Sequence, residues 1–183
     1  MCSSDLPFGR GEIRAARDAR ILFLPQRPYL PLGLLRDVVS YPMAARGVAD
    51  EALREALDVV GLTELAGRLH ESAHWALQLS PGEQQRMAFA RALVQKPEWL
   101  FLDEATSAVD ETTEACLYRL LRERLGETTV LSIGHRTTLR PFHARRLMVQ
   151  RVGDAPAFIV ELPTTGGVGS GHGALMHDDG GKY

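Results

Sequence analysis

The chain has 183 residues, a net charge of −2 and 45% hydrophobic residues, enough to bury the core of one domain. The charge is near balance and forms no basic patch, which argues against nucleic acid as a partner. No apolar run approaches the roughly 20 residues of a membrane span, and no secretory signal peptide is visible. The two cysteines, Cys2 and Cys116, lack metal-site or disulfide spacing, so a reducing cytosol is the expected compartment.

The amino-terminal residues fall into three expected parts. Residues 1–6 are expected to be non-native, because reverse translation from a GTG start codon resembles the end of a common sequencing adaptor. Residues 7–19 are basic and are read as a connector. The apolar run Ile21–Leu24 predicts a strand, which leads into Gln26 between two prolines. Taken alone, that glutamine indicates only a surface turn.

A mostly helical stretch follows. Residues 48–60 predict a helix, because apolar residues recur at helical spacing, and Gly61 is suited to end it. His70 and His74 are four residues apart and could share a helix face. A metal site needs more ligands than two, so both are interpreted as solvated or structural histidines.

The stretch LSPGEQQR predicts the start of the next helix. Ser80 is a good N-cap, Pro81 suits the first helical position, and Glu83 completes a capping box. Gly82 leaves the first turn without a side chain, so a ligand could approach the backbone closely. Free N–H groups and the positive end of the helix dipole then make an anion site, although a lone capping box more often only starts a helix.

This helix is expected to run to about Lys96, before Pro97 ends it. We expect it to be amphipathic, with apolar residues on one side. Three polar residues at i, i+7 and i+11 share the opposite side: Gln84, Arg91 and Gln95.

Trp99–Leu102 is a short apolar run that predicts a parallel strand buried on both faces. It ends in Asp103 and Glu104, and functional groups in such sheets lie at the carboxyl ends of strands. Two adjacent carboxylates there are costly unless they meet a metal or a polarised water. One can hold Mg²⁺ while its neighbour deprotonates the attacking water. For the pair alone, an ordinary acidic loop is the better interpretation.

The rest of the chain predicts one helix, three strands and a tail. Asp110 is placed to cap a helix over residues 111–125, and a strand over residues 128–133 leads to His135, which is placed for a phosphate. Alone, that histidine would more often be structural. Two further strands, over residues 146–152 and 157–162, form a closing hairpin, and the Gly-rich residues 163–183 are expected to be disordered.

Four motifs in this order resemble parts of ABC-transporter ATPase domains, over roughly residues 7–150. FLPQRP resembles the Q-loop, LSPGEQQR the signature motif, LFLDEATSAVD the Walker B motif with the D-loop, and SIGHR the H-loop. The resemblance implies an α/β fold of the P-loop NTPase type, with three layers and a mostly parallel sheet. Residues 7–162 would be the carboxyl-terminal part of the ATPase domain. The inserted helical subdomain, about residues 34–80, would touch the membrane-spanning partner.

The resemblance implies ATP and Mg²⁺ as cofactors and assigns the catalytic roles. Asp103 is expected to bind Mg²⁺ through water, and Glu104 to be the general base. His135 is expected to contact the γ-phosphate, and Gln26 to link metal, water and membrane domain.

The signature and D-loop residues are expected to act across a dimer interface. Ser80, Pro81, Gly82 and Glu83 would close on the ATP of the opposite subunit. Pro81 stands where the family has glycine and removes an amide donor, and Glu83 stands where it has glutamine and adds a negative charge. The D-loop residues expected at the same interface are Ser107 and Asp110.

No Walker A motif, G-x-x-x-x-G-K-[ST], occurs in the sequence. In the family that loop precedes the Q-loop strand and cradles the phosphates. We therefore expect the Walker A unit to lie upstream, and the 183 residues alone to be inactive in ATP hydrolysis.

The function implied is ATP hydrolysis that powers transport at the cytoplasmic face of a membrane, with the bacterial inner membrane as the expected one. The motifs look most like fused permease–ATPase half-transporters of the peptide-antibiotic, vitamin B12 and peroxisomal acyl-CoA types. The expected partners are a second ATPase domain and a permease domain fused upstream, with no nucleic acid. Two alternatives stay open: an ABC ATPase of DNA repair or translation, and a non-catalytic module that only dimerises or docks.

Overall fold

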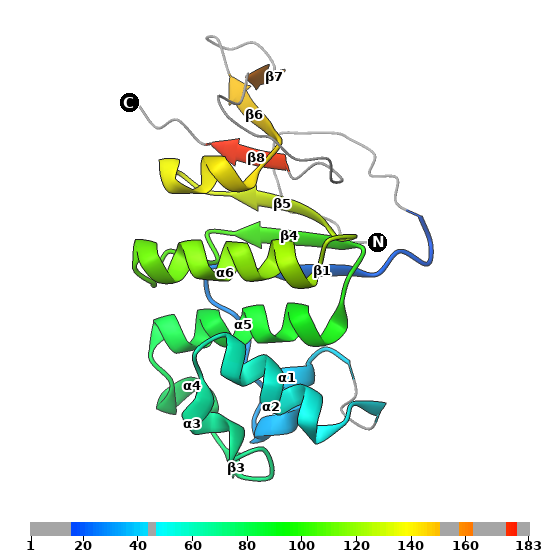
Figure 1. The fold of residues 1–183 in the computed structure, drawn as a ribbon, viewed down its shortest axis with the longest axis vertical. Coiled ribbons are helices and arrows are strands. Elements are labelled where there is room, and N and C mark those ends of the chain that lie inside the picture. Colours follow the sequence, from blue (N-terminus) through cyan, green and yellow to red (C-terminus); the bar gives the residue numbers. More distant parts are fainter. Residues whose placement is uncertain (1–15, 44–46, 151–157, 163–174, 179–183) are drawn as a thin grey trace, which may run out of the picture.

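The computed structural model describes residues 16–43, 47–150, 158–162 and 175–178. Helix α5 (Pro81–Gln95) lies between a sheet and a group of small helices (Figure 1). The small helices are α1 (Leu35–Ser40), α2 (Asp50–Val59), α3 (Thr63–Ala66) and α4 (Trp75–Gln78). Two short strands beside them, β2 (Gly33–Leu34) and β3 (Ser72–Ala73), pair with each other. None of the helices in the described residues is both long enough and apolar enough to span a bilayer.

The sheet has six strands in the order β1-β4-β5-β8-β6-β7. All neighbouring pairs are parallel except β6 and β7, which form the predicted antiparallel hairpin; its turn lies outside the described residues. The strands are β1 (Ile21–Leu24), β4 (Trp99–Asp103), β5 (Thr129–Ile133), β6 (Arg145–Gln150), β7 (Phe158–Leu162) and β8 (Leu175–Asp178). The strands expected from the apolar runs are therefore confirmed. The parallel neighbours β1, β4 and β5 all end at the same edge of the sheet.

The expectation of disorder over residues 163–183 is wrong at Leu175–Asp178. These residues form β8 and pair in parallel with β5 on one side and β6 on the other (Figure 1). Two facing strand edges carry rows of N–H and C=O groups that need partners, and four residues are enough to bridge them despite the surrounding glycines. The other residues of this tail, and residues 1–6, lie outside the described part of the chain.

Helix α5 has the predicted bounds, but the amphipathic expectation is wrong. Arg91, placed on the polar side by its spacing, is only 4% exposed. The helix packs against α1 and α2 on one side and against β1 and α6 (Glu111–Arg124) on the other. Arg91 therefore donates inside the molecule, from Nε to the Val38 carbonyl at 2.8 Å and from a terminal nitrogen to the Tyr29 carbonyl at 2.8 Å. Burial lowers the pKa of Arg91 to about 10.

The group of small helices is held together by a buried tryptophan and by a hydrogen bond between His70 and Asp50. The Trp75 ring is fully buried, and its Nε1 donates to the Gly33 carbonyl at 2.9 Å. Helix α2 covers most of the predicted helix, and Gly61 follows it with a φ of 76°, as expected for a residue that ends a helix. His70 lies 2.7 Å from an Asp50 carboxylate oxygen, and no metal-binding cluster of three His, Cys, Asp or Glu side chains exists within the described ranges.

The two faces of the sheet differ, so the expectation of strands buried on both faces is wrong. On the face toward α5 and α6, the leucines of β1 and β4 are buried in the common core. On the opposite face Phe23 is 65% exposed and Trp99 is 40% exposed, and Phe23 stacks on Phe101 with ring centroids 4.6 Å apart. Two of the three expected layers therefore lie in the described residues, and the sheet face opposite α5 and α6 carries an aromatic strip.

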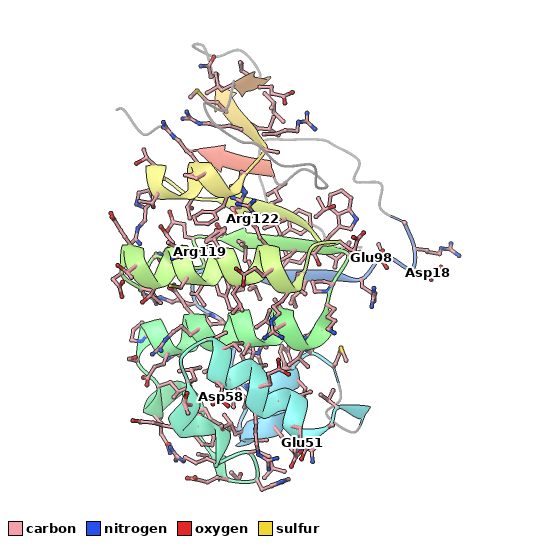
Figure 2. The ribbon with its side chains drawn as sticks, viewed as in Figure 1. Asp18, Glu51, Asp58, Glu98, Arg119 and Arg122 are labelled. Carbon is pink, nitrogen blue, oxygen red and sulfur yellow. The ribbon has the colours of Figure 1, made fainter. Side chains whose placement is uncertain are left out.

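Helix α6 covers the sheet and presents charge to solvent. Asp110 caps it as predicted, and the exposed Arg119 and Arg122 lie on its outer surface, as Glu51 and Asp58 do on α2 (Figure 2). Cys116, also on α6, is an exposed free thiol.

His143 gives the fold a pH-dependent stability. It is 4% exposed against the Tyr118 ring, and neither ring nitrogen has a hydrogen-bond partner among the described residues. Burial lowers its pKa from 6.5 to about 4. In the unfolded chain His143 therefore takes up a proton near pH 6.5, whereas in the folded chain it stays neutral until about pH 4. We expect full stability above pH 6.5, and a loss of about 1.4 kcal/mol per pH unit as pH falls toward 4.

Denaturant unfolding measured at several pH values tests this expectation. His143→Leu should remove that pH dependence, whereas the exposed His74→Leu should keep it. Equal slopes in the wild type and in His143→Leu between pH 6.5 and 4 would contradict the assignment.

Candidate functional site

Three neighbouring parallel strands each deliver one polar side chain to the same edge. Gln26 follows β1, Glu104 follows β4 and His135 follows β5, in the spatial order β1-β4-β5. Gln26 Nε2 donates to Glu104 Oε2 at 3.0 Å, and His135 Nδ1 lies 3.4 Å from Glu104 Oε1. The structure thus brings three of the predicted site residues into contact, with the Glu104 carboxylate between the other two.

The backbone of Glu104 adopts the left-handed conformation, with a φ of 46°. For a residue other than glycine this conformation costs about 1–2 kcal/mol. It is held because the Glu104 N–H donates to the Ile133 carbonyl at 3.0 Å, which continues the strand pairing while the chain turns. Such a strained residue at a strand end is typical of functional sites.

Asp103 is the last residue of β4 and is exposed, so water and a hydrated cation can reach its carboxylate. Mg²⁺ prefers oxygen ligands, and oxygens are what Asp103, Glu104 and the Gln26 amide supply. Since Gln26 Nε2 is used by Glu104, the amide oxygen is the end of that side chain suited to a metal. These residues fit a cation that keeps several waters and shares phosphate oxygens, which is how Mg²⁺ is usually bound.

The capping box at the start of α5 is confirmed. Ser80 Oγ accepts from the Glu83 N–H at 3.3 Å, and Glu83 Oε2 accepts from the Ser80 N–H at 2.8 Å and from the Ser80 hydroxyl at 2.6 Å. The Ser80 hydroxyl, and then its backbone N–H, hold the pKa of Glu83 below its ordinary value. Glu83 is therefore occupied within its own helix, and Pro81 at the first helical position has no N–H to offer.

The side of Gly82 on which a side chain would lie faces the protein itself. A Cβ atom at this position would lie 3.0 Å from the Ala108 carbonyl oxygen and 3.5 Å from a Val109 methyl. The loop that follows Glu104 covers that face of the helix. An anion bound at this helix start would contact backbone N–H groups and would lie beside the loop that follows Glu104.

The predicted D-loop residues have local partners. Ser107 Oγ accepts from Gln85 Nε2 at 3.1 Å. Asp110 accepts from the Thr113 N–H at 2.9 Å and from the Thr113 hydroxyl at 2.8 Å, and the backbone N–H is the main reason that the pKa of Asp110 is lowered. The Ser107 N–H donates to the Glu104 carbonyl at 3.0 Å. Within the described ranges the Glu104 carboxylate contacts the side chains of Gln26 and His135 and not those of Ser80, Ser107 or Asp110, so the latter form a separate group of site residues.

Three residues that hold the loops around the site were missed by sequence reasoning. Arg136 donates to the Val109 carbonyl at 3.1 Å and to the Ser107 carbonyl at 3.2 Å, and its position directly after His135 was a signal for it. Glu114 is 1% exposed and accepts from the hydroxyls of Thr106 and Thr138; its spacing from Leu117 and Tyr118, at i+3 and i+4, was a signal that it lies on the buried face of α6. The third residue is the buried Gln85, the second glutamine of EQQR.

Comparisons with known proteins show the family to which the chain belongs. A protein-family model described as ABC transporter matches residues 6–107. An uncharacterized ABC transporter ATP-binding protein of Haemophilus influenzae is 42% identical over 146 residues, covering 80% of this chain and 24% of the relative. The human lysosomal cobalamin transporter ABCD4 is 40% identical over 134 residues, covering 68% of this chain and 22% of the relative.

A solved structure also matches. The structure of a bacterial Atm1-family ABC exporter with ATP bound superposes with a TM-score of 0.58 and 28% identity, covering 66% of this chain and 22% of the exporter chain. The fold is therefore that of a P-loop-type α/β unit. The chain belongs to the ABC transporter family, and it spans about a quarter of the length of the curated relatives it matches.

Proposed function

We propose that residues 7–162 form the carboxyl-terminal part of an ATP-hydrolysing domain that powers transport across a membrane. The observation that carries this proposal is the Glu104 carboxylate, held between Gln26 and His135 at the carboxyl ends of three parallel strands. A carboxylate oriented by two neighbours is the arrangement that a general base requires, because proton transfer depends on position before pKa.

In the proposed reaction Glu104 accepts a proton from the water that attacks the γ-phosphate of ATP. Gln26 holds one oxygen of the carboxylate, so the base keeps a fixed direction. His135 Nδ1 lies 3.4 Å from Glu104 Oε1, and Nε2 would donate to the phosphate, which requires a proton on Nε2. Bound Mg²⁺ would neutralise phosphate charge, and Asp103 and the Gln26 amide oxygen would hold it there.

The second group of site residues is proposed to act on the ATP of another subunit. The donor proposed for the phosphate at the start of α5 is the Gly82 N–H, because Pro81 lacks a donor and Glu83 is engaged in the capping box. The Ser80 hydroxyl donates to Glu83 Oε2 at 2.6 Å and would have to leave that partner to bind a phosphate. Ser107 and Asp110 would lie at the same interface. The proposed partners are a second copy of this domain and a membrane-spanning permease domain of the same polypeptide. The permease would contact α1–α4 at the cytoplasmic face.

The proposal predicts that Asp103 governs the need for Mg²⁺. In the complete gene product, Asp103→Asn should raise the Mg²⁺ concentration for half-maximal ATP hydrolysis roughly 10–100-fold, the usual effect of losing a residue that orients metal-bound water. Chelation with EDTA should abolish turnover. The measurement is steady-state phosphate release against Mg²⁺ concentration.

Glu98→Gln is the matched control, because Glu98 is an exposed acid next to the opposite end of the same strand, 3.3 Å from Arg20. It should leave the Mg²⁺ requirement unchanged. An unaltered Mg²⁺ dependence in Asp103→Asn, or turnover that survives EDTA, would remove Asp103 from the metal site.

A further inference from the structure

Gln85, one turn into α5, links three segments that are far apart in the sequence. Its side chain is 2% exposed. Nε2 donates to the Gln26 carbonyl at 2.9 Å and to Ser107 Oγ at 3.1 Å, and Oε1 accepts from the Ala108 N–H at 2.8 Å. A single buried amide therefore ties the start of α5 to the Gln26 segment and to the loop after Glu104.

The partners also explain why this position holds glutamine. A backbone carbonyl can only accept and a backbone N–H can only donate, so the Gln26 and Ala108 partners fix which end of the amide is nitrogen. A glutamate at Gln85 could still accept from Ala108, but its second oxygen would face the Gln26 carbonyl without a proton. A leucine would leave both backbone groups buried and unpaired, which is the more costly outcome.

Both segments held by Gln85 adjoin the Glu104 carboxylate. The Gln26 residue whose carbonyl is held is the one whose side chain donates to Glu104 at 3.0 Å. The loop held at Ser107 and Ala108 begins at Glu104 itself, and Arg136 holds the same loop through the Ser107 carbonyl at 3.2 Å. The direction of Glu104 therefore depends on contacts made on either side of it by Gln85.

We propose that Gln85 is a positioning residue for ATP hydrolysis. It fixes the Gln26 segment and the 107–108 loop relative to each other, so that Glu104 faces the attacking water. This inference rests on the proposed role of Glu104 as the base. Gln85 touches neither ATP nor water in this account, and its effect passes entirely through Gln26 and the loop.

The test compares Gln85→Glu and Gln85→Leu with a control in the complete gene product. Gln95→Leu is the matched control, because Gln95 lies on the same helix and also donates to two backbone carbonyls, those of Ser40 and Tyr41, away from Glu104. Each Gln85 variant should lower kcat about 10–100-fold, since small misplacements of a catalytic group have effects of that size, while KM for ATP changes less than about threefold. Gln95→Leu should change kcat by less than about twofold.

Hydrogen exchange of the peptide that contains Ala108 separates the two variants. In Gln85→Leu the Ala108 N–H loses its acceptor, so its exchange should speed up about tenfold or more. In Gln85→Glu the acceptor remains and exchange should stay near the wild-type rate, although kcat falls. A residue that only stabilises the fold is not expected to lower kcat while the Ala108 N–H keeps its protection from hydrogen exchange. If Gln85→Leu unfolds, the near-isosteric Gln85→Glu still tests the proposal.

The double variant with Glu104→Gln completes the test. If Gln85 acts through Glu104, Gln85→Glu should reduce the residual turnover of Glu104→Gln by less than about twofold. The inference is overturned if both Gln85 variants keep wild-type kcat, if Gln95→Leu loses kcat equally, or if the effects of Gln85→Glu and Glu104→Gln multiply. Wild-type turnover in Glu104→Gln alone would instead refute the proposed function.

Discussion

Replacing Glu104 with glutamine is expected to lower ATP turnover of the complete gene product by about 10²–10⁴-fold, the usual effect of losing a positioned base. A glutamine can keep both neighbours, because its amide oxygen can accept from Gln26 Nε2 as the carboxylate does at 3.0 Å. The geometry is kept while the proton acceptor is lost. ATP binding should persist, so kcat falls and nucleotide affinity stays close to that of the wild type.

Glu123→Gln is the matched control for this charge change, because Glu123 is exposed on α6 and has no assigned role in the site. Its turnover should equal that of the wild type. Steady-state phosphate release and equilibrium nucleotide binding measure the two quantities separately. Near-wild-type turnover in Glu104→Gln would remove Glu104 from the reaction.

Placing an arginine at Gly82 is expected to have the second largest effect. Even a Cβ there would lie 3.0 Å from the Ala108 carbonyl oxygen, and a backbone atom cannot move aside as a flexible side chain can. The variant must therefore displace the loop after Glu104, and its bulk would also block the N–H donors at the start of α5. We expect turnover to fall on the order of 10²-fold or more, comparable with losing a preorganised anion-binding donor.

The matched control is Gly126→Arg, because a Cβ at Gly126 meets only the Arg122 carbonyl oxygen at 3.9 Å, an ordinary contact, and Gly126 lies outside the helices proposed to contact the permease. It should keep wild-type turnover. In mixed dimers with one Gly82→Arg subunit, the site that this signature completes for the other subunit should fail. If only the nucleotide held by the altered subunit itself were affected, the proposed action across the interface would be wrong.

Local signals in the sequence predicted the ends of elements well. Ser80, Pro81 and Glu83 marked the start of α5, and Asp110 marked the start of α6, because capping depends on residues that are adjacent in the chain. The contact of Gln26, Glu104 and His135 could also be anticipated, since each follows an apolar run and parallel strands end at one edge of the sheet.

Features that depend on what surrounds an element could not be predicted. Arg91 looks solvated by helical spacing, but α5 lies between two packed layers, so Arg91 donates to a distant backbone carbonyl. The Gln26 carbonyl that accepts from Gln85 is also distant in the sequence. Phe23 and Trp99 are exposed because the described helices cover only the other face of the sheet. A run of apolar residues does not reveal which face is covered. Strand β8 was missed because its pairing partners are supplied by β5 and β6, which lie far from it in the sequence.

The most direct measurement is the identity of the nucleotide retained by Glu104→Gln. The complete gene product is incubated with ATP and Mg²⁺, freed of unbound nucleotide, denatured and analysed for ATP and ADP. If Glu104 is the base that activates the attacking water, the variant retains intact ATP, whereas the wild type and Glu123→Gln retain ADP or no nucleotide. Retention of ADP by Glu104→Gln, formed as fast as in the wild type, would contradict the account.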